Sequence, residues 1–347
     1  CYLGSLATAS LYFFDPGHLE WSMLSIFLAS VGFWNSLVFY NAYLPEVAAP
    51  EDQDKLSAKG FSLGYAGASI LLIACLIGIQ MFDMPAEYAF ILTGVWWIGF
   101  SQITYTVLPN SQSKNTITWH ILGDGFRELR KVGNFIKTTY RLKRFLISFF
   151  LFSMGVQTVM LIAVLFAKKE VFVGPHANDA GLIIAVLLIQ FIAIPGAYTF
   201  SWGARKIGNI KTLGVALFIW SLCCTYAYLF VKDELNFYIL AVVVGFVMGG
   251  TQSLSRSTYS KYLPETKDTA SFFSFYDITE KVGIVIGMVS VGLMEATFGS
   301  MRTSVLALIA FFVLGFIALF FIPKDENTAF NDTSNDDILD DKQEQTI

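Results

Sequence analysis

The sequence predicts an all-α membrane protein, and three observations support this fold class. The 347-residue chain is 55% hydrophobic and 16% aromatic. Only 14% of its residues are charged, whereas soluble domains carry about 25%. Apolar runs recur along the chain, and several are about 20 residues long, which is the length of a helix that crosses a hydrocarbon core of about 30 Å. An outer-membrane barrel would instead show alternating segments of about ten residues.

Ten apolar runs define the expected spans, and all are predicted to be helical. In chain order they cover residues 2–23, 24–44, 61–81, 88–108, 145–167, 181–202, 212–231, 237–255, 271–294 and 304–322. Asp15, Pro16 and Gly17 break the first run after fourteen residues, so we expect the chain to begin in the middle of a helix.

The distribution of basic residues predicts the orientation, because Lys and Arg are enriched in cytoplasmic loops. Eighteen of the 23 lie on the side that holds residues 109–144 and the carboxyl-terminal tail, and four lie on the other side. The remaining one, Lys281, is inside a span. We expect the larger group to face the cytoplasm and the membrane to be a bacterial inner membrane, with residues 168–180 and 232–236 facing outward.

Residues 109–144 form the long internal connection and divide the chain. A stripe at helical spacing opposes a basic face and predicts an amphipathic helix: Phe126, Leu129, Val132, Ile136 and Tyr140. We expect a linker helix at the inner leaflet, the alternative being a specific lipid or regulator site. The predicted domains are an amino-terminal bundle of four spans (1–108), this linker (109–144), a six-helix bundle (145–322) and a disordered acidic tail (323–347).

The two sides of the linker share a repeat. The pattern Y-x-x-Y-L-P-E occurs at 40–46 and at 259–265, each time between the third-last and second-last spans of its half. Duplicated six-helix bundles joined by a cytoplasmic loop are the plan of major facilitator transporters. We therefore expect a major facilitator fold of two pseudo-repeated bundles with ten of twelve helices present, the missing two belonging before Cys1.

Three segments carry a resemblance to a known family. YNAYLPEVAAPEDQDKLSAKGFSLGYAG (40–67), GGTQSLSRSTYSKYLPE (249–265) and FFSFYDITEKVGIVIG (272–287) resemble the Atg-type vacuole effluxer-like branch of the major facilitator superfamily. The resemblance implies a twelve-helix transporter, and efflux of amino acids is ascribed to vacuolar fungal members. The chain departs from the superfamily's G-x-L-A-D-R-x-G loop, since SWGARKIG (201–208) places Arg205 at the acid position and predicts the loss of the usual Asp-mediated gate contact.

The segment 272–287 places Asp277, Glu280 and Lys281 two to three turns inside an apolar span. Charges at that depth are costly and face a bundle interior or a cavity. Asp277 and Lys281 have the spacing of an intrahelical ion pair. Glu280 is predicted to point to a different side, with Arg256 as its available cation. The cluster is either a site for substrate or a coupling proton, or an ion-pair lock between helices.

Polar amides near the membrane midplane extend the predicted pocket. Asn35, Gln157 and Gln190 lie on helices that border the central cavity in the superfamily arrangement, although each could instead make an interhelical hydrogen bond. Arg256 and Arg205 are the gate candidates. Three glycine pairs permit close helix approach: Gly60 and Gly64, Gly245 and Gly249, and Gly283 and Gly287.

The predicted function is secondary active transport. No P-loop, H-E-x-x-H or G-x-S-x-G motif occurs, which argues against an enzyme and against a nucleotide-driven pump. We expect efflux of amino acids or similar small polar solutes, coupled to a proton or another ion, by a monomer surrounded by membrane lipid. No cofactor, metal or nucleic-acid partner is expected. The alternative is a receptor or scaffold that retains the transporter fold.

Overall fold

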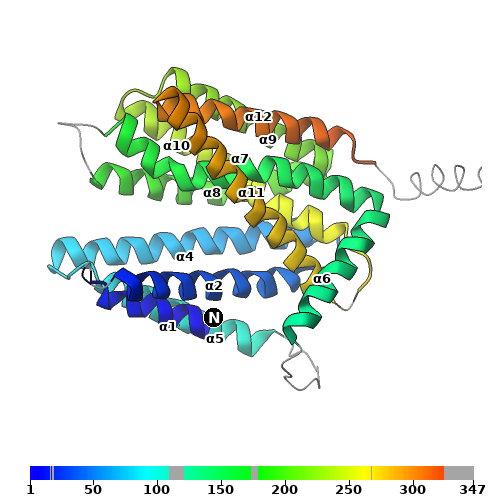
Figure 1. Cartoon of the computed structure of the whole chain (residues 1–347), viewed down its shortest axis with the longest axis horizontal. Coiled ribbons are helices and arrows are strands. Elements are labelled where there is room, and N and C mark those ends of the chain that lie inside the picture. Colours follow the sequence, from blue (N-terminus) through cyan, green and yellow to red (C-terminus); the bar gives the residue numbers. More distant parts are fainter. Residues whose placement is uncertain (16, 18, 109–120, 173–178, 267, 324–347) are drawn as a thin grey trace, which may run out of the picture.

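The computed structural model describes residues 1–15, 17, 19–108, 121–172, 179–266 and 268–323, and its regular secondary structure in these ranges is helical (Figure 1). The elements are α1 (Tyr2–Ser10), the short 3-10 helix η1 (Leu11–Phe13), α2 (Leu19–Ala42), α3 (Leu44–Val47), α4 (Gln53–Met81), α5 (Tyr88–Val107), α6 (Ile121–Thr138), α7 (Tyr140–Glu170), α8 (Asp179–Ile207), α9 (Asn209–Leu229), α10 (Glu234–Lys261), α11 (Thr269–Phe298) and α12 (Met301–Phe320). The predicted acidic tail lies outside the described residues apart from Pro323.

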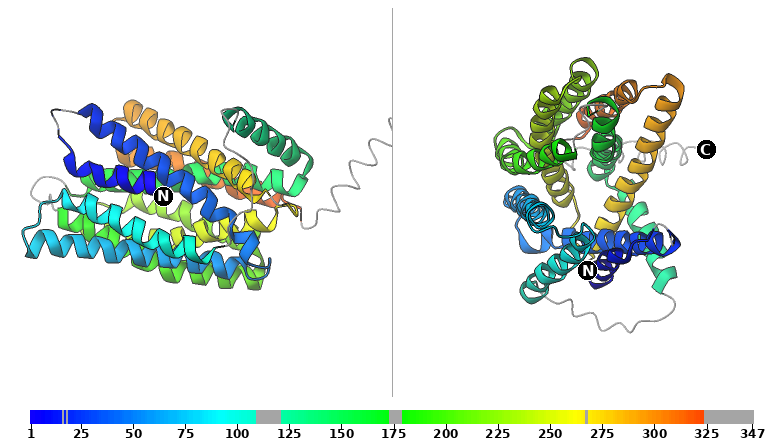
Figure 2. Two further views of the ribbon diagram at one scale, coloured as in Figure 1. Left: turned by 90° about the horizontal axis from the view of Figure 1, so that it is seen from below. Right: turned by 90° about the vertical axis from the view of Figure 1, so that its left-hand side faces the viewer.

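The long helices run side by side in two groups. Helices α7 to α12 form one group, and α1, α2, α4 and α5 form the other, as the end-on view in Figure 2 (right) shows. The groups meet where α4 packs on α8 and α10 and where α2 packs on α11. Helix α6 crosses the others at the end of the molecule where α7 begins (Figure 1).

The chain is a multi-pass membrane protein. Within the described ranges, eight helices are long and apolar enough to cross a bilayer: α2 with α3, α4 and α7 to α12. Helix α1, with nine residues, is too short to cross by itself, and α5 is not among the eight. Large apolar side chains such as Leu63, Val95 and Phe218 point outward, which suits a surface covered by lipid.

The boundary between the first two predicted spans is wrong. Helix α2 begins at Leu19, so the change of direction lies at the Asp15–Gly17 break and not at residue 23. At this break the Gly17 amide donates to Asp15 Oδ1 at 2.9 Å, a local side-chain to backbone bond that competes with continuing the helix. The apolar residues 19–23 therefore belong to the second span.

Several helices extend beyond their apolar runs on the side where α6 lies. Helix α4 begins at Gln53 and α10 ends at Lys261, so both continue into polar sequence that hydropathy had assigned to loops. A helix satisfies its own backbone hydrogen bonds, so its polar end turns remain helical where they meet water or partner side chains. These added turns carry part of the candidate site.

Helix α6 packs on protein through two residues of its predicted apolar stripe. Val132 and Ile136 are each 5% exposed, and the Phe135 ring contacts that of Phe272 on α11, with ring centres 5.7 Å apart. Phe126, at the other end of the stripe, is 78% exposed. The linker helix is thus attached to the helix that carries the charged cluster.

Candidate functional site

The charged residues of α11 lie well inside their span. At 1.5 Å per residue, Asp277 and Lys281 are roughly 12 and 18 Å along the axis from Thr269, the first residue of α11. The Asp277 and Glu280 side chains are 18% and 15% exposed, and that of Lys281 is 27% exposed. The cluster is therefore mostly shielded but not closed off.

Lys281 is the centre of this cluster. Its Nζ lies 3.0 Å from Asp277 Oδ1 and 2.9 Å from Glu280 Oε2. The same Nζ lies 3.3 Å from the centre of the Trp34 ring, on α2 of the other helix group. An ammonium above an indole face is attracted by the negative face of the ring. Lys281 thus joins the two groups through its charge.

Glu280 shares Lys281 with Asp277, so the expectation that it points to a different side is wrong. Its other oxygen, Oε1, accepts a hydrogen bond from Gln157 Nε2 on α7. The backbone directions of residues 280 and 281 do differ, but the flexible lysine stem carries Nζ back to the carboxylate. Two carboxylates and one ammonium leave the cluster with a formal charge of −1.

Arg256 is not the partner of Glu280. It lies on α10, is 5% exposed, and donates from Nε to Ser57 Oγ and from Nη2 to the Ser57 carbonyl, both at 3.0 Å. Its Nη1 donates to Asn41 Oδ1 at 3.0 Å. The guanidinium also stacks over Phe61, 4.5 Å from the ring centre. Arg256 therefore ties α10 to α2 and α4.

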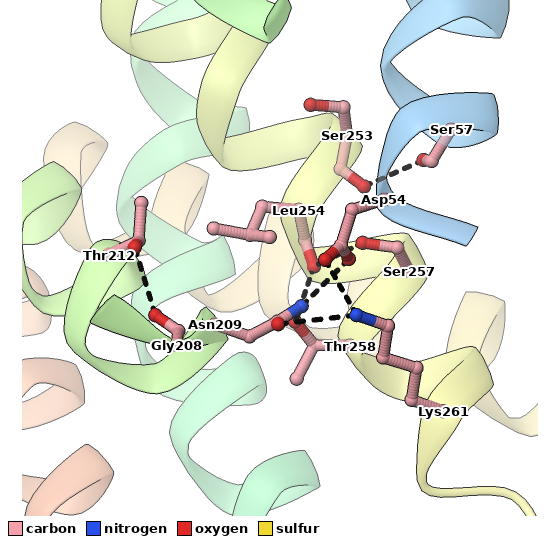
Figure 3. Close-up of polar contacts among 10 residues, drawn as sticks. All are labelled: Asp54, Ser57, Gly208, Asn209, Thr212, Ser253, Leu254, Ser257, Thr258 and Lys261. Atoms are coloured by element: carbon pink, nitrogen blue, oxygen red, sulfur yellow. Dashed lines mark hydrogen bonds and ion pairs between the residues drawn. The ribbon is translucent and has the colours of Figure 1, made fainter. Parts of the chain in front are cut away.

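A largely buried ion pair joins the two groups at the end of the molecule that carries α6 (Figure 1), and Figure 3 shows its contacts. Lys261 Nζ on α10 lies 2.6 Å from Asp54 Oδ2 on α4, and the Asp54 side chain is only 2% exposed. Asn209, the first residue of α9, donates to Asp54 Oδ1 at 2.8 Å and to Thr258 Oγ1 at 3.0 Å. Both oxygens of the Asp54 carboxylate are thus used as acceptors.

The same end is closed by further polar contacts. Ser57 Oγ donates to the Ser253 carbonyl at 2.7 Å, linking α4 to α10. Thr269 Oγ1, at the start of α11, donates to Glu46 Oε1 on α3 at 2.8 Å. We call the α4–α9–α10 part of this network the polar seal, and it consists of Asp54, Ser57, Asn209, Ser253, Arg256, Thr258 and Lys261.

The remaining predicted site residues are separate from the cluster. Gln190 on α8 accepts from Ser69 Oγ on α4 at 2.8 Å, which is an interhelical hydrogen bond. Asn35 is exposed and donates to the Val31 carbonyl of its own helix at 2.8 Å. Arg205 is exposed at the end of α8. Of the predicted amides, Gln157 alone contacts the α11 charges among the described residues.

Sequence reasoning missed Trp34, Asp54 and Asn209. Asp54 lies within the segment 40–67 that carried the family resemblance, so its place beside the repeat was a usable signal. Asn209 directly follows the loop in which Arg205 replaces the expected acid. In the structure Asn209 donates instead to the Asp54 carboxylate, which lies on α4.

One titratable group just beyond the seal has a shifted pKa. Burial raises the pKa of the Tyr262 hydroxyl, and the nearby Arg141 guanidinium opposes part of that shift. Arg141 lies 4.1 Å from the Tyr262 ring centre and donates from Nη2 to its hydroxyl at 3.3 Å. Tyr262 is therefore a neutral phenol at neutral pH.

Comparisons with known proteins agree with this arrangement. A relative from Bacillus subtilis, described as the uncharacterized MFS-type transporter YxiO, is 29% identical over 346 residues, covering 96% of this chain and 78% of that protein. Autophagy-related protein 22-1 of Aspergillus niger is 28% identical over 275 residues, covering 72% of this chain and 44% of that protein. The chain thus spans about half the length of the fungal relatives it matches.

Solved structures show the same fold at low sequence identity. The Escherichia coli fucose:proton symporter FucP superposes with a TM-score of 0.62 at 16% identity, covering 93% of this chain and 82% of that one. The human organic anion transporter MFSD10 gives a TM-score of 0.64 at 11% identity, covering 92% and 76%. These proteins are named as transporters and not as enzymes. The family described as "Vacuole effluxer Atg22 like" matches residues 1–329. The chain therefore belongs to the Atg22-like vacuole effluxer family and has the major facilitator fold.

Proposed function

We propose that this protein is a secondary active transporter that exports amino acids or similar small polar solutes by alternating access, driven by an ion gradient. The observation that carries the proposal is the α11 cluster, which lies between the two helix groups, beyond a polar seal that joins them at one end. The names of the relatives, an MFS-type transporter and vacuole effluxers, support export. The fungal resemblance supports amino acids.

Alternating access gives the seal and the cluster different roles. In transporters of this fold, two bundles rock about a site near the bilayer midplane. The polar seal must break for the site to open toward the α6 end, because Lys261 and Asp54 belong to different groups. The cluster also has one contact, Lys281 with Trp34, that such a movement would change.

We place the α6 end in the cytoplasm on the basis of the charge asymmetry. With that orientation, the polar seal closes the cytoplasmic side. Glu280 is the proposed proton carrier, because it is an acidic side chain inside a span that contacts both Gln157 on α7 and Lys281.

The test is transport by purified full chain in liposomes, comparing Glu280→Gln with wild type. We expect the variant to lose gradient-driven flux of an amino-acid mixture while it retains exchange at saturating solute concentration, since a neutral amide keeps the site shape but carries no proton. Glu295→Gln is the matched control, since Glu295 lies on the same helix in an ion pair with Lys169 away from the cluster.

Three other results would contradict the proposal. Wild-type flux in Glu280→Gln would remove Glu280 from coupling, and loss of both flux and exchange would place it in a lock. Absence of any solute movement by folded wild-type protein, with a wide amino-acid mixture on both sides, would favour a receptor or scaffold.

A further inference from the structure

The surroundings of the Lys281 ammonium form a site with walls from both helix groups. Trp34 supplies an aromatic face from α2, and Asp277 and Glu280 supply carboxylate oxygens from α11. Gln157, from α7, holds Glu280 by its second oxygen and leaves Oε2 directed at Nζ. We call Trp34, Asp277 and Glu280 the ammonium box.

The box has the chemistry that recognises an alkylammonium ion. A primary ammonium has three N–H donors, and here two carboxylates lie at 2.9 and 3.0 Å from the nitrogen. The ring face at 3.3 Å adds an attraction that a strongly hydrated metal ion exploits less well. The group in the box is an ammonium on a four-carbon stem, which is itself an alkylammonium ion tethered to the chain.

An empty box would be costly inside a membrane span. Two carboxylates without a cation would be desolvated and would repel each other. Lys281 removes this cost in the conformation in which the polar seal is closed. The polar seal joins α10 to α4, and the box joins α11 to α2. Both therefore lie between the same two helix groups, so the movement that closes the seal also fills the box.

We propose that the ammonium box is the subsite for the amino group of the exported solute, and that Lys281 is a tethered competitor that occupies it when the solute has left. This inference rests on the proposed transport function and names the feature that the solute must carry. In the conformation in which the polar seal is closed, Lys281 displaces the solute ammonium and favours its release. The filled box then lets the unloaded protein return without a second cation.

The test measures binding of a named probe, propylammonium, to the purified full chain in detergent by its effect on thermal stability. In wild type the tethered ammonium competes at high effective concentration. In Lys281→Ala the box is vacant, so we expect saturable stabilisation by propylammonium with an apparent Kd at least about tenfold lower than in wild type. Sodium and potassium chloride at equal ionic strength should not reproduce the effect.

A second substitution tests the aromatic wall. Adding Trp34→Leu to Lys281→Ala should weaken propylammonium binding by roughly 2- to 30-fold, the factor that corresponds to an ammonium–ring contact. Lys169→Met is the matched control, since it removes a lysine from an ion pair with Glu295 elsewhere and should leave the wild-type response unchanged.

Folding of the variants is monitored by size-exclusion chromatography. Should Lys281→Ala fail to fold, Lys281→Ala with Asp277→Asn leaves one carboxylate and should bind the probe more weakly but saturably. Folded lysine-free variants that show no probe-dependent stabilisation, or the same response with and without Trp34, would overturn the inference. Binding in detergent needs no transport. Probe binding without flux would therefore contradict the transport proposal and reduce the box to a cation-binding site. Flux without probe binding would contradict the ammonium subsite alone.

Discussion

Asp54 is the residue on which the polar seal depends most. Its carboxylate is 2% exposed and accepts from both Lys261 and Asn209, so it serves two helices of the opposite group. A buried ion pair contributes little net stability to a fold, but removing one partner leaves the other charge unpaired. A single substitution in the polar seal is therefore destabilising, although the intact ion pair changes the net stability of the fold only slightly.

We predict that Asp54→Asn opens the sealed end. Truncating one partner of a buried, hydrogen-bonded charge pair costs about 2–5 kcal/mol. Amide hydrogen exchange should become faster in the first turns of α4 and the last turns of α10. Glu265→Gln is the control, because Glu265 is exposed on the same side. Exchanging the charges with Asp54→Lys and Lys261→Asp should restore part of the protection, and unchanged exchange in Asp54→Asn would contradict a role in the seal.

At the scale of elements, the crossing of α8 and α10 has the closest approach to backbone atoms among the three glycine pairs. A Cβ on Gly249 would lie 2.1 Å from the Ala193 carbonyl oxygen, and one on Gly245 would lie 2.6 Å from that of Ile189. Backbone atoms cannot move aside as a flexible side chain can. The third pair, Gly283 with Gly287, similarly approaches α7, whereas a Cβ on Gly64 would meet open space.

We predict that Gly249→Ala destabilises the α8–α10 pair by about 1–3 kcal/mol, the usual cost of forcing extra volume into a packed contact. The measurement is thermal unfolding in detergent. Gly292→Ala provides the comparison, because Gly292 is also helical and a Cβ added there would meet no described atom within 4 Å, so alanine should be neutral or stabilising. Equal stability of the two variants would show that the crossing tolerates separation.

At the scale of the whole molecule, the proposed orientation places α6 and the polar seal on one side of the membrane and the α9–α10 connection on the other. Single cysteines test this in a background without the four native ones. Asn134→Cys on α6 should be protected from an impermeant thiol reagent in intact cells, and Lys232→Cys should be labelled. Both positions are exposed, so access to the reagent depends on the side of the membrane. The reverse pattern would invert the topology and make the seal an outer one.

The sequence by itself determined the class of protein and most helix positions, and it predicted the charged cluster on α11. Hydrophobic length and the Lys/Arg distribution are local properties, so they can be read without knowing what packs against what. The Asp277–Lys281 spacing is likewise local, because both residues lie on one helix. The internal repeat was visible because its two copies have identical residues at matching positions.

Only the tertiary structure decided which charges meet. Trp34 and Lys281 are joined across the two helix groups, as are Asp54 and Lys261, and no periodicity within a helix encodes such a pairing. Arg256 was predicted to pair with Glu280 because it lies at the inner end of the preceding span. In the structure its guanidinium, which has five N–H donors, instead binds Ser57 and Asn41 of the facing group. Partner choice between helices depends on their rotation and separation, which are set by close contacts such as that at Gly249, so the site is specified by packing and not by any one segment.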